Sequence, residues 1–227
     1  MRPFVLVHHG VGAVTDAEDP DRLVVSPEHL ESQVRLLLRL GYRFVTAEEL
    51  IERGPARRTA VLTFDDGWRD GLTVVAPLLE RLGVRASFYV SAGLWGTQHA
   101  LVTGPAGELM TPDDARELTA RGMEVASHGL THPDLRTLDD AALDAELRDS
   151  RAAIEEVTGR PCRSFAYPFG LLDARAKARV GAAGYELALA WGARRQWDPL
   201  EVGRLPGPPR HGASRLALKM AGIRRPA

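Results

Sequence analysis

Two pairs of residues in this sequence have the types and the spacing of a hydrolytic site. Asp65 and Asp66 close a short apolar run and precede a glycine, and His128 and His132 follow a second apolar run. Either pair alone has an ordinary explanation, because Asp-Asp-Gly also forms simple turns and histidine pairs at this spacing also occur on surfaces and in cores. Their joint presence at two expected strand ends of one small domain favours a shared site.

The chemistry of these groups points to metal-assisted hydrolysis. One carboxylate and two imidazoles, with water in the remaining position, are the ligand pattern of catalytic zinc-type sites. A cation held there lowers the pKa of the water and polarises a substrate carbonyl. Because consecutive strand residues point to opposite sides, Asp65 and Asp66 need not do the same job. The second carboxylate could take the proton from the water, and a further group must then protonate the leaving amine or alcohol.

The segments between these groups alternate between strand-like and helix-like patterns. The run 60–64 is rich in strand formers, whereas 139–158 has helical character and is closed by a glycine. Helix starts carry recognisable signals, such as the cap Ser26 before a proline and the capping-box pattern 46–49. This alternation predicts parallel strands with right-handed crossovers. Ligands bind at the carboxyl ends of such strands, where both pairs of residues are expected.

Three motifs, in matching order and spacing, resemble a known family. They are TFDDG at 63–67, SHGLTH at 127–132 and SFAYPFG at 164–170. They look like the first three motifs of the polysaccharide deacetylases, the NodB-homology domains of carbohydrate esterase family 4, and the similarity extends through nearly the whole chain. The resemblance implies one catalytic domain over residues 1–227 with an α/β fold, a distorted (β/α) barrel. It also implies removal of N-acetyl, sometimes O-acetyl, groups from glycans with a divalent metal.

The resemblance also implies roles for the four residues of the two pairs. Carried over by position, Asp65 is the base, and Asp66, His128 and His132 are the metal ligands. Zinc is the first expectation for the ion. Cobalt, nickel, manganese and iron are alternatives, because nitrogen and oxygen ligands discriminate poorly among these metals.

The N-terminal segment 4–11 resembles the branch that includes poly-N-acetylglucosamine deacetylases. In that branch the histidine of a Tyr-His segment is the general acid, and the matching residue is His9, whereas His8 stands where those enzymes usually carry tyrosine. The alternative is that one of this pair is simply a polar residue at a strand end. His211, in a proline-rich loop, is a weaker candidate for the acid, and His99 reads as a surface residue of a polar loop.

One position departs from the family pattern. Many members carry an arginine after the phenylalanine of the third motif, where it orients the catalytic carboxylate, and this chain has Ala166. Arg204 resembles an arginine near the end of related deacetylases and is the candidate replacement. Arg163 lies an odd number of strand positions from Ala166, so its side chain is expected to face the other way, as a solvated surface charge.

The third motif has an electrostatic interpretation. A backbone N–H aimed at the developing oxyanion is a common device in amide hydrolysis, and in the family that amide belongs to the residue after the proline, here Phe169. Tyr167 and Phe169 are expected to wall the acetyl pocket, and Trp191 to stack on a sugar. Ordinary core packing at a strand end is the alternative for each of these aromatic residues.

Composition is that of an ordinary globular enzyme. The chain has 227 residues, and its 29 basic and 30 acidic side chains give a net charge of −1, so it has no nucleic-acid footprint. The single Cys162 excludes an internal disulfide and a cysteine metal cluster. The N-terminus carries neither a secretory hydrophobic region nor a membrane span, which leads to the expectation of a cytoplasmic protein. Nothing in the sequence predicts the oligomeric state.

Two segments interrupt the alternation of strands and helices. Residues 93–107 have the composition of a loop, which we expect near the carboxyl face of the barrel, where it could shape a substrate groove. Residues 215–225 are basic with interspersed apolar residues. They predict a terminal helix that covers the barrel, with a membrane-surface contact as the alternative.

The sequence therefore predicts a metal-dependent hydrolase that removes the N-acetyl group from an amino sugar or glycan. A first alternative is hydrolysis of another amide or ester, such as an O-acetylated glycan or a secondary metabolite. The site residues do not identify which acyl group is removed. A second alternative is a non-catalytic glycan-binding protein on a degenerate barrel. The alanine at position 166 keeps this second alternative open, and the full set Asp65, Asp66, His128 and His132 argues against it.

Overall fold

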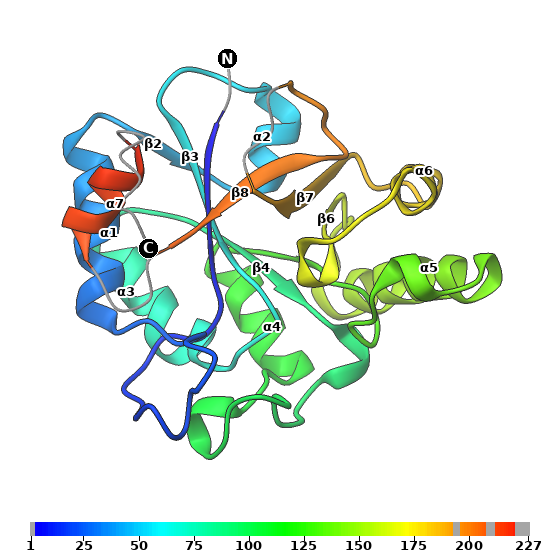
Figure 1. Ribbon diagram of the computed structural model, residues 1–227, viewed down its shortest axis with the longest axis horizontal. Helices are drawn as coiled ribbons and strands as arrows, with labels where there is room; N and C mark the ends of the chain where they lie inside the picture. Colours follow the sequence, from blue (N-terminus) through cyan, green and yellow to red (C-terminus); the bar gives the residue numbers. More distant parts are fainter. Residues whose placement is uncertain (1–2, 193–195, 208–211, 221–227) are drawn as a thin grey trace.

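The computed structural model describes residues 3–192, 196–207 and 212–220, which form alternating strands and helices (Figure 1). The strands are β1 (Phe4–His8), β2 (Arg43–Val45), β3 (Thr59–Phe64), β4 (Ser87–Val90), β5 (Glu124–Ser127), β6 (Ser164–Ala166), β7 (Leu187–Trp191) and β8 (Val202–Pro206). The α-helices are α1 (Pro27–Arg39), α2 (Ala47–Arg53), α3 (Ala76–Arg81), α4 (Pro112–Ala120), α5 (Asp140–Thr158), α6 (Ala174–Ala182) and α7 (Ala213–Met220).

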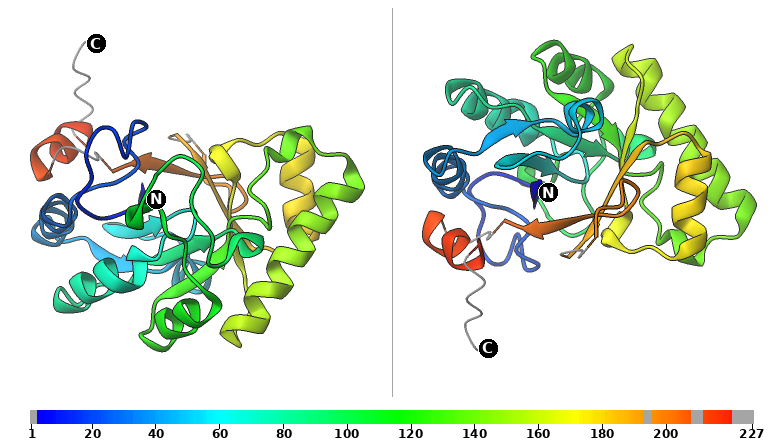
Figure 2. Two further views of the ribbon diagram at one scale, coloured as in Figure 1. Left: turned by 90° about the horizontal axis from the view of Figure 1, so that it is seen from below. Right: turned by 90° about the horizontal axis from the view of Figure 1, so that it is seen from above.

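The strands close into a parallel barrel. Strand order runs β1-β8-β7-β6-β5-β4-β3, and β3 pairs back with β1, so seven strands form the ring. Strand β2 pairs with the first half of β3, and β4 pairs with its last two residues, which makes the barrel irregular at this seam. The helices lie outside the strands (Figure 2). This architecture confirms the predicted distorted (β/α) barrel.

Helix boundaries follow from local chemistry. The side chain of Ser26 accepts a hydrogen bond from the amide of His29 at the start of α1, and a proline occupies the first turn. At the start of α2, Thr46 and Glu49 form the predicted reciprocal capping box. Helix α1 buries Leu30, Val34 and Leu37, whose spacing places them on one face toward the barrel. Such caps and faces fix where each helix begins and which side it packs.

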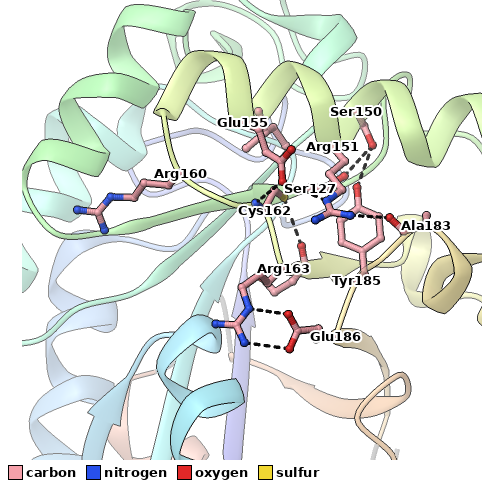
Figure 3. Close-up of polar contacts among 12 residues, drawn as sticks. Ser127, Ser150, Arg151, Glu155, Arg160, Cys162, Arg163, Ala183, Tyr185 and Glu186 are labelled. Carbon is pink, nitrogen blue, oxygen red and sulfur yellow. Dashed lines mark hydrogen bonds and ion pairs between the residues drawn. The ribbon is translucent and has the colours of Figure 1, made fainter.

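The amino-terminal end of the barrel is occupied by structural contacts. Glu124 is partly buried there, and its carboxylate accepts hydrogen bonds from the hydroxyls of Ser87 and Ser164. Nearby, Arg163 forms a two-armed ion pair with Glu186 just before β7 (Figure 3). The expectation that Arg163 is a surface charge away from the site is confirmed.

The C-terminal helix α7 packs beside α1, as the red and blue helices of Figure 1 show. Leu216 is fully buried in this contact region. The predicted terminal helix therefore exists over Ala213–Met220, and the rest of the segment 215–225 lies outside the described residues. Among the described residues, no helix is both long enough and apolar enough to cross a membrane.

Candidate active site

The candidate site lies at the carboxyl ends of the barrel strands. Asp65 and Asp66 follow β3 directly, His128 follows β5, and Phe169 comes shortly after β6. The backbone amide of Asp65 donates to the carbonyl oxygen of His8, so the ends of β1 and β3 lie side by side. Parallel strands thus bring together residues that are far apart in the sequence, as expected for this kind of sheet.

Three side chains converge as a possible metal site. The Oδ1 atom of Asp66 lies 3.4 Å from Nε2 of His128 and 3.4 Å from Nε2 of His132. Ligand atoms of these three residues all lie within 4.8 Å of one another. One carboxylate oxygen and two imidazole nitrogens at this spacing fit a divalent cation such as zinc with an open coordination position.

The ring orientation of His128 is fixed by a hydrogen bond at the nitrogen that points away from the site. Its Nδ1 lies 2.8 Å from the carbonyl oxygen of Ala166, which can only accept a hydrogen bond, so Nδ1 carries a proton and Nε2 faces the site. Burial and the nearby charge of His128 lower the pKa of His132 to about 4, so that this imidazole is neutral at pH 7. Burial opposes the charged form of His128, but Asp65 and Asp66 outweigh it and raise the pKa of His128, so a metal ion that binds Nε2 of His128 would displace a proton there.

Asp65 is held by a buried arginine. Nη1 of Arg204 donates to Oδ1 of Asp65 at 2.6 Å, and both side chains are almost fully buried. Burial opposes ionisation of Asp65, but the charges of Arg204 and His128 outweigh it and keep the pKa of the carboxyl below its ordinary value. Asp65 is therefore an ionised carboxylate 3.8 Å from Nε2 of His128, beside the possible metal site.

The two N-terminal histidines occupy different surroundings. His8 is buried, with Nε2 3.0 Å from the side-chain oxygen of Gln33 in α1, and its ring stacks on Phe64. His9 is partly exposed and directly follows His8, whose carbonyl oxygen accepts from the amide of Asp65. His9 thus lies at the carboxyl end of β1, at the same end of the barrel as Asp65, whereas the side chain of His8 packs between β1 and α1.

Backbone strain is concentrated at the site. Asp66, His132 and Phe169 all have positive φ angles, of 68°, 61° and 58°. Only Arg22 and Arg58 share this property among the other described non-glycine residues. A left-handed conformation costs a side-chain-bearing residue about 1–3 kcal/mol and persists where the surrounding structure requires it, commonly at functional sites.

The three aromatic residues predicted to contact substrate have different exposures. Phe169 is 57% exposed, and its ring meets the edge of His132 at a centroid distance of 4.6 Å. Trp191 is 47% exposed at the end of β7, against Gly170. Tyr167 is fully buried, and its hydroxyl donates to the carbonyl of Leu200, so the prediction that it walls the acetyl pocket is wrong and the core-packing alternative holds.

Comparison with models of known protein families identifies the family to which the three motifs belong. The model named polysaccharide deacetylase matches residues 52–188, which is more than half of the chain. The chain belongs to the polysaccharide deacetylase family. The expected resemblance is therefore confirmed.

The relatives of this chain are distant in sequence. It is 21% identical over 190 residues to YxkH of Bacillus subtilis (strain 168), a match that covers 82% of this chain and 63% of YxkH. It is 30% identical over 126 residues to a chitin deacetylase of Colletotrichum lindemuthianum, covering 56% of this chain and 48% of that enzyme. The chain thus spans less than two thirds of the length of these relatives.

Solved structures share the fold over nearly the whole chain. The Streptococcus pyogenes deacetylase PplD, whose structure contains acetate, has a TM-score of 0.80 at 22% identity, covering 97% of this chain and 98% of PplD. IcaB from Ammonifex degensii has a TM-score of 0.75 at 22% identity, covering 98% and 96%. These likenesses show that this chain has the same barrel fold.

Residues outside the three motifs also contact the site. His99 was expected on the surface, but its Nε2 lies 3.3 Å from Oδ2 of Asp66, and this expectation is wrong. The indole Nε1 of Trp68 donates to the same oxygen at 3.3 Å. His99 belongs to the segment 93–107, so the expectation that this loop runs near the carboxyl face is confirmed. His211, the weaker candidate acid, lies outside the described residues.

Glu146 in α5 is a further residue that the motifs do not reveal. Its carboxylate accepts hydrogen bonds from the amides of Leu130 and Thr131, both at 2.6 Å, and from the hydroxyl of Thr131 at 3.1 Å. It therefore holds the loop that connects His128 to His132. A signal existed in the sequence, because Glu146 is a charged residue on the face of α5 that also buries Leu143, Leu147, Ser150 and Ile154.

Proposed function

We propose that this chain is a metal-dependent deacetylase that removes the N-acetyl group from an amino sugar of a glycan. The observation that carries the proposal is that the two adjacent aspartates have different partners. Asp66 lies with two imidazoles at metal-ligand spacing, whereas Asp65 stands beside them, ionised and bound to Arg204. Family membership supports carbohydrate deacetylation as the reaction class.

The residues proposed to hold the ion are Asp66, His128 and His132. Two neutral imidazole nitrogens and one carboxylate oxygen suit zinc, and also cobalt, nickel, manganese or iron, better than calcium or magnesium, which prefer oxygen ligands alone. When bound, such a cation lowers the pKa of an adjacent water and polarises the acetyl carbonyl.

The first half of the reaction depends on Asp65. As the base, it takes a proton from the water that attacks the acetyl carbon. Arg204 keeps the carboxylate ionised and fixes its orientation, which is the role that the resemblance assigns to the motif arginine missing at Ala166. The backbone N–H of Phe169, in the strained turn after β6, donates to the developing oxyanion.

The second half requires a proton for the leaving group. An amine leaves an amide poorly unless its nitrogen is protonated as the C–N bond breaks. His9 is proposed to supply this proton, because it follows β1 directly, at the strand end that pairs with the end of β3 before Asp65. The products are acetate and the free amino sugar. Phe169 and Trp191, both exposed beside the site, are proposed to contact the sugar.

Metal content and product release test this function together. Protein reconstituted with Zn²⁺ is assayed for acetate release from N-acetylglucosamine conjugates, poly-N-acetylglucosamine oligomers and O-acetylated sugars. Asp65→Asn should keep the metal and lose turnover, because the amide can still accept from Arg204 but cannot take a proton. His128→Ala should lose the metal as well. Asp113→Asn, at an exposed carboxylate of α4, is the matched control and should behave like the wild type.

The outcomes separate the alternatives. Release from N-acetylated substrates that disappears in both site variants supports the proposal. Release only from O-acetylated substrates would replace it with an esterase. Stoichiometric metal without any release would indicate a different acyl substrate, and neither metal nor release would favour a glycan-binding protein.

A further inference from the structure

The two oxygens of Asp66 face different surroundings. Oδ1 lies 3.4 Å from Nε2 of both His128 and His132, on the side of the proposed metal. Oδ2 faces the opposite way, 3.3 Å from Nε1 of Trp68 and 3.3 Å from Nε2 of His99. Asp66 therefore lies between two imidazoles on one side and two ring N–H groups on the other.

The tautomer of His99 follows from its second ring nitrogen. The backbone amide of Leu101 donates to Nδ1 of His99 at 3.2 Å. An imidazole nitrogen that accepts a hydrogen bond carries no proton, so in the neutral ring the proton is on Nε2. His99 thus faces Oδ2 of Asp66 with an N–H group, and it offers no lone pair to a metal at that nitrogen.

The loop that carries His99 is fixed to the first motif by backbone contacts. The amide of Met110 donates to the carbonyl of Gly67 at 2.8 Å, and Trp68 forms an isolated antiparallel bridge with Leu109. The amide of His99 itself donates to the carbonyl of Gly107 at 2.8 Å. These contacts hold the imidazole in place from both ends of the loop.

Side-chain packing supports the same arrangement. The rings of His99 and Trp68 lie 4.5 Å apart between centroids. Trp68 is 2% exposed and packs with Val24, Val102 and Leu109 in a small apolar cluster that is separate from the barrel core. Both N–H groups are therefore fixed by packing before any ligand binds.

We propose that His99 and Trp68 are positioning residues. They hold the carboxylate of Asp66 so that it binds the metal through one oxygen only. By occupying Oδ2, their N–H groups leave only Oδ1 for the ion and prevent the carboxylate from turning to bind through both oxygens. Partners behind a metal ligand typically contribute a factor of about 10–100 to metal affinity. The inference rests on the proposed function, because it presumes the metal site of Asp66, His128 and His132.

The test compares metal affinities of metal-free wild type and variants, measured by competition with a chromophoric chelator for Zn²⁺. His99→Ala and Trp68→Phe each remove one N–H donor, and each should weaken Zn²⁺ binding by about 10-fold or more. His99→Gln keeps an N–H group at a similar reach and should recover most of the loss. Gln98→Ala, at an exposed neighbour in the same loop, is the matched control and should leave the affinity unchanged.

Two further readouts separate positioning from general damage. Thermal unfolding of the metal-free proteins should stay cooperative in His99→Ala as in Gln98→Ala, because the backbone contacts that hold the loop to Gly67 and Trp68 do not involve the side chain of His99. With Co²⁺ in the site, His99→Ala should weaken the visible absorption, since a carboxylate that binds through both oxygens raises the coordination number.

Each result decides for or against the inference. Weaker binding in His99→Ala and Trp68→Phe, with recovery in His99→Gln, supports it. Wild-type Zn²⁺ affinity in both His99→Ala and Trp68→Phe would overturn this inference and leave the proposed function untouched. Loss of affinity in His99→Gln equal to that in His99→Ala would also overturn it and would make the imidazole itself the requirement. Wild-type protein that binds no metal would overturn the proposed function together with this inference.

Discussion

Nη1 of Arg204 lies 2.6 Å from Oδ1 of Asp65, although 139 positions separate the two residues in the sequence. Arg204 is on β8 and Asp65 follows β3, with β1 between the two strands in the barrel. The guanidinium also lies 6.0 Å from the ring centre of Tyr89 and donates to the hydroxyl of Thr63. The strand order of the barrel therefore creates a buried ion pair at the base of the candidate site.

Arg204→Met should impair both activity and stability. Without the guanidinium, burial raises the pKa of Asp65, so a smaller fraction of the base is ionised and its orientation is no longer fixed. Turnover should fall by about 100-fold or more, and the acid limb of the kcat profile should move to higher pH. Removing one partner of a buried pair costs about 3–5 kcal/mol of unfolding free energy, which urea denaturation can measure.

The companion variant Arg204→Lys separates charge from geometry. It keeps a positive charge but replaces the planar fork by a single ammonium group, so partial activity and a smaller pKa shift are expected. Wild-type turnover in Arg204→Met would contradict the proposed role of Arg204.

His9→Gln should impair substrates according to their leaving group. An N-acetylated sugar needs a proton on its leaving amine, so its turnover should fall by about 100-fold or more. An activated aryl acetate releases a stable phenolate without a proton, and its hydrolysis should fall much less. His8→Gln is the control, because His8 contacts Gln33 outside the site. Equal losses on both substrates in His9→Gln would argue against His9 as the acid.

The parallel strands and the grouping of Asp66, His128 and His132 were predictable because their signals are local. Alternating strand and helix patterns predicted parallel strands with crossovers, the resemblance of the three motifs implied the barrel, and the Thr46 capping box formed as expected. His99 was not predictable, because its approach to Asp66 depends on how a loop folds back through the bridge between Trp68 and Leu109. Neither residue spacing nor hydrophobic periodicity carries that information.

Tyr167 is a second residue whose surroundings could not be predicted from the sequence, because it is in the core where a site residue was expected. Its position between a strand and the Pro-Phe-Gly turn is compatible with a pocket wall or with core packing. The choice depends on the carbonyl of Leu200, 33 positions away, which accepts its hydroxyl. Long-range partners of this kind separate an aromatic residue in a site from one in the core.

Asp70 should make the stability of the protein depend on pH. One of its oxygens accepts from the amide of Val11, and the other is buried without a hydrogen-bond partner among the residues that the structure describes. Burial, opposed by the bond from Val11, raises the pKa of Asp70 to about 8. The folded state thus binds the proton more tightly than the unfolded state, so this carboxyl lowers stability as pH rises from about 4 to about 8, and the loss levels off above that.

Asp70→Asn removes this titration and leaves an acceptor for Val11. The difference in unfolding free energy between variant and wild type, measured on metal-free protein, should increase toward pH 8 by several kcal/mol in favour of the variant, on the order of one per pH unit. Asp113→Asn, at an exposed carboxylate, should show no such trend. A difference that stays constant from pH 4 to pH 9 would contradict a raised pKa for Asp70.

Glu146→Ala should weaken metal binding without touching a proposed ligand. The carboxylate of Glu146 accepts two backbone amides and one hydroxyl from the loop between His128 and His132. Losing it leaves the amides of Leu130, which is partly buried, and Thr131, which is exposed, without their acceptor, at a cost below the roughly 1–3 kcal/mol of a fully buried group. The strained φ of 61° at His132 depends on that loop being held, so its relaxation should move the imidazole away from Asp66.

Zn²⁺ affinity in Glu146→Ala should therefore fall by about 10–100-fold, as measured by chelator competition. Glu146→Gln keeps one acceptor oxygen for the loop amides and should lose less. A substitution on the exposed side of the same helix, Asp149→Ala, controls for damage to α5. The carboxylate of Glu146 bonds to the loop and is not among the proposed ligands, so a fall in affinity would show that α5 positions His132 through the backbone. An unchanged affinity in Glu146→Ala would mean instead that the barrel strands alone hold the two histidines.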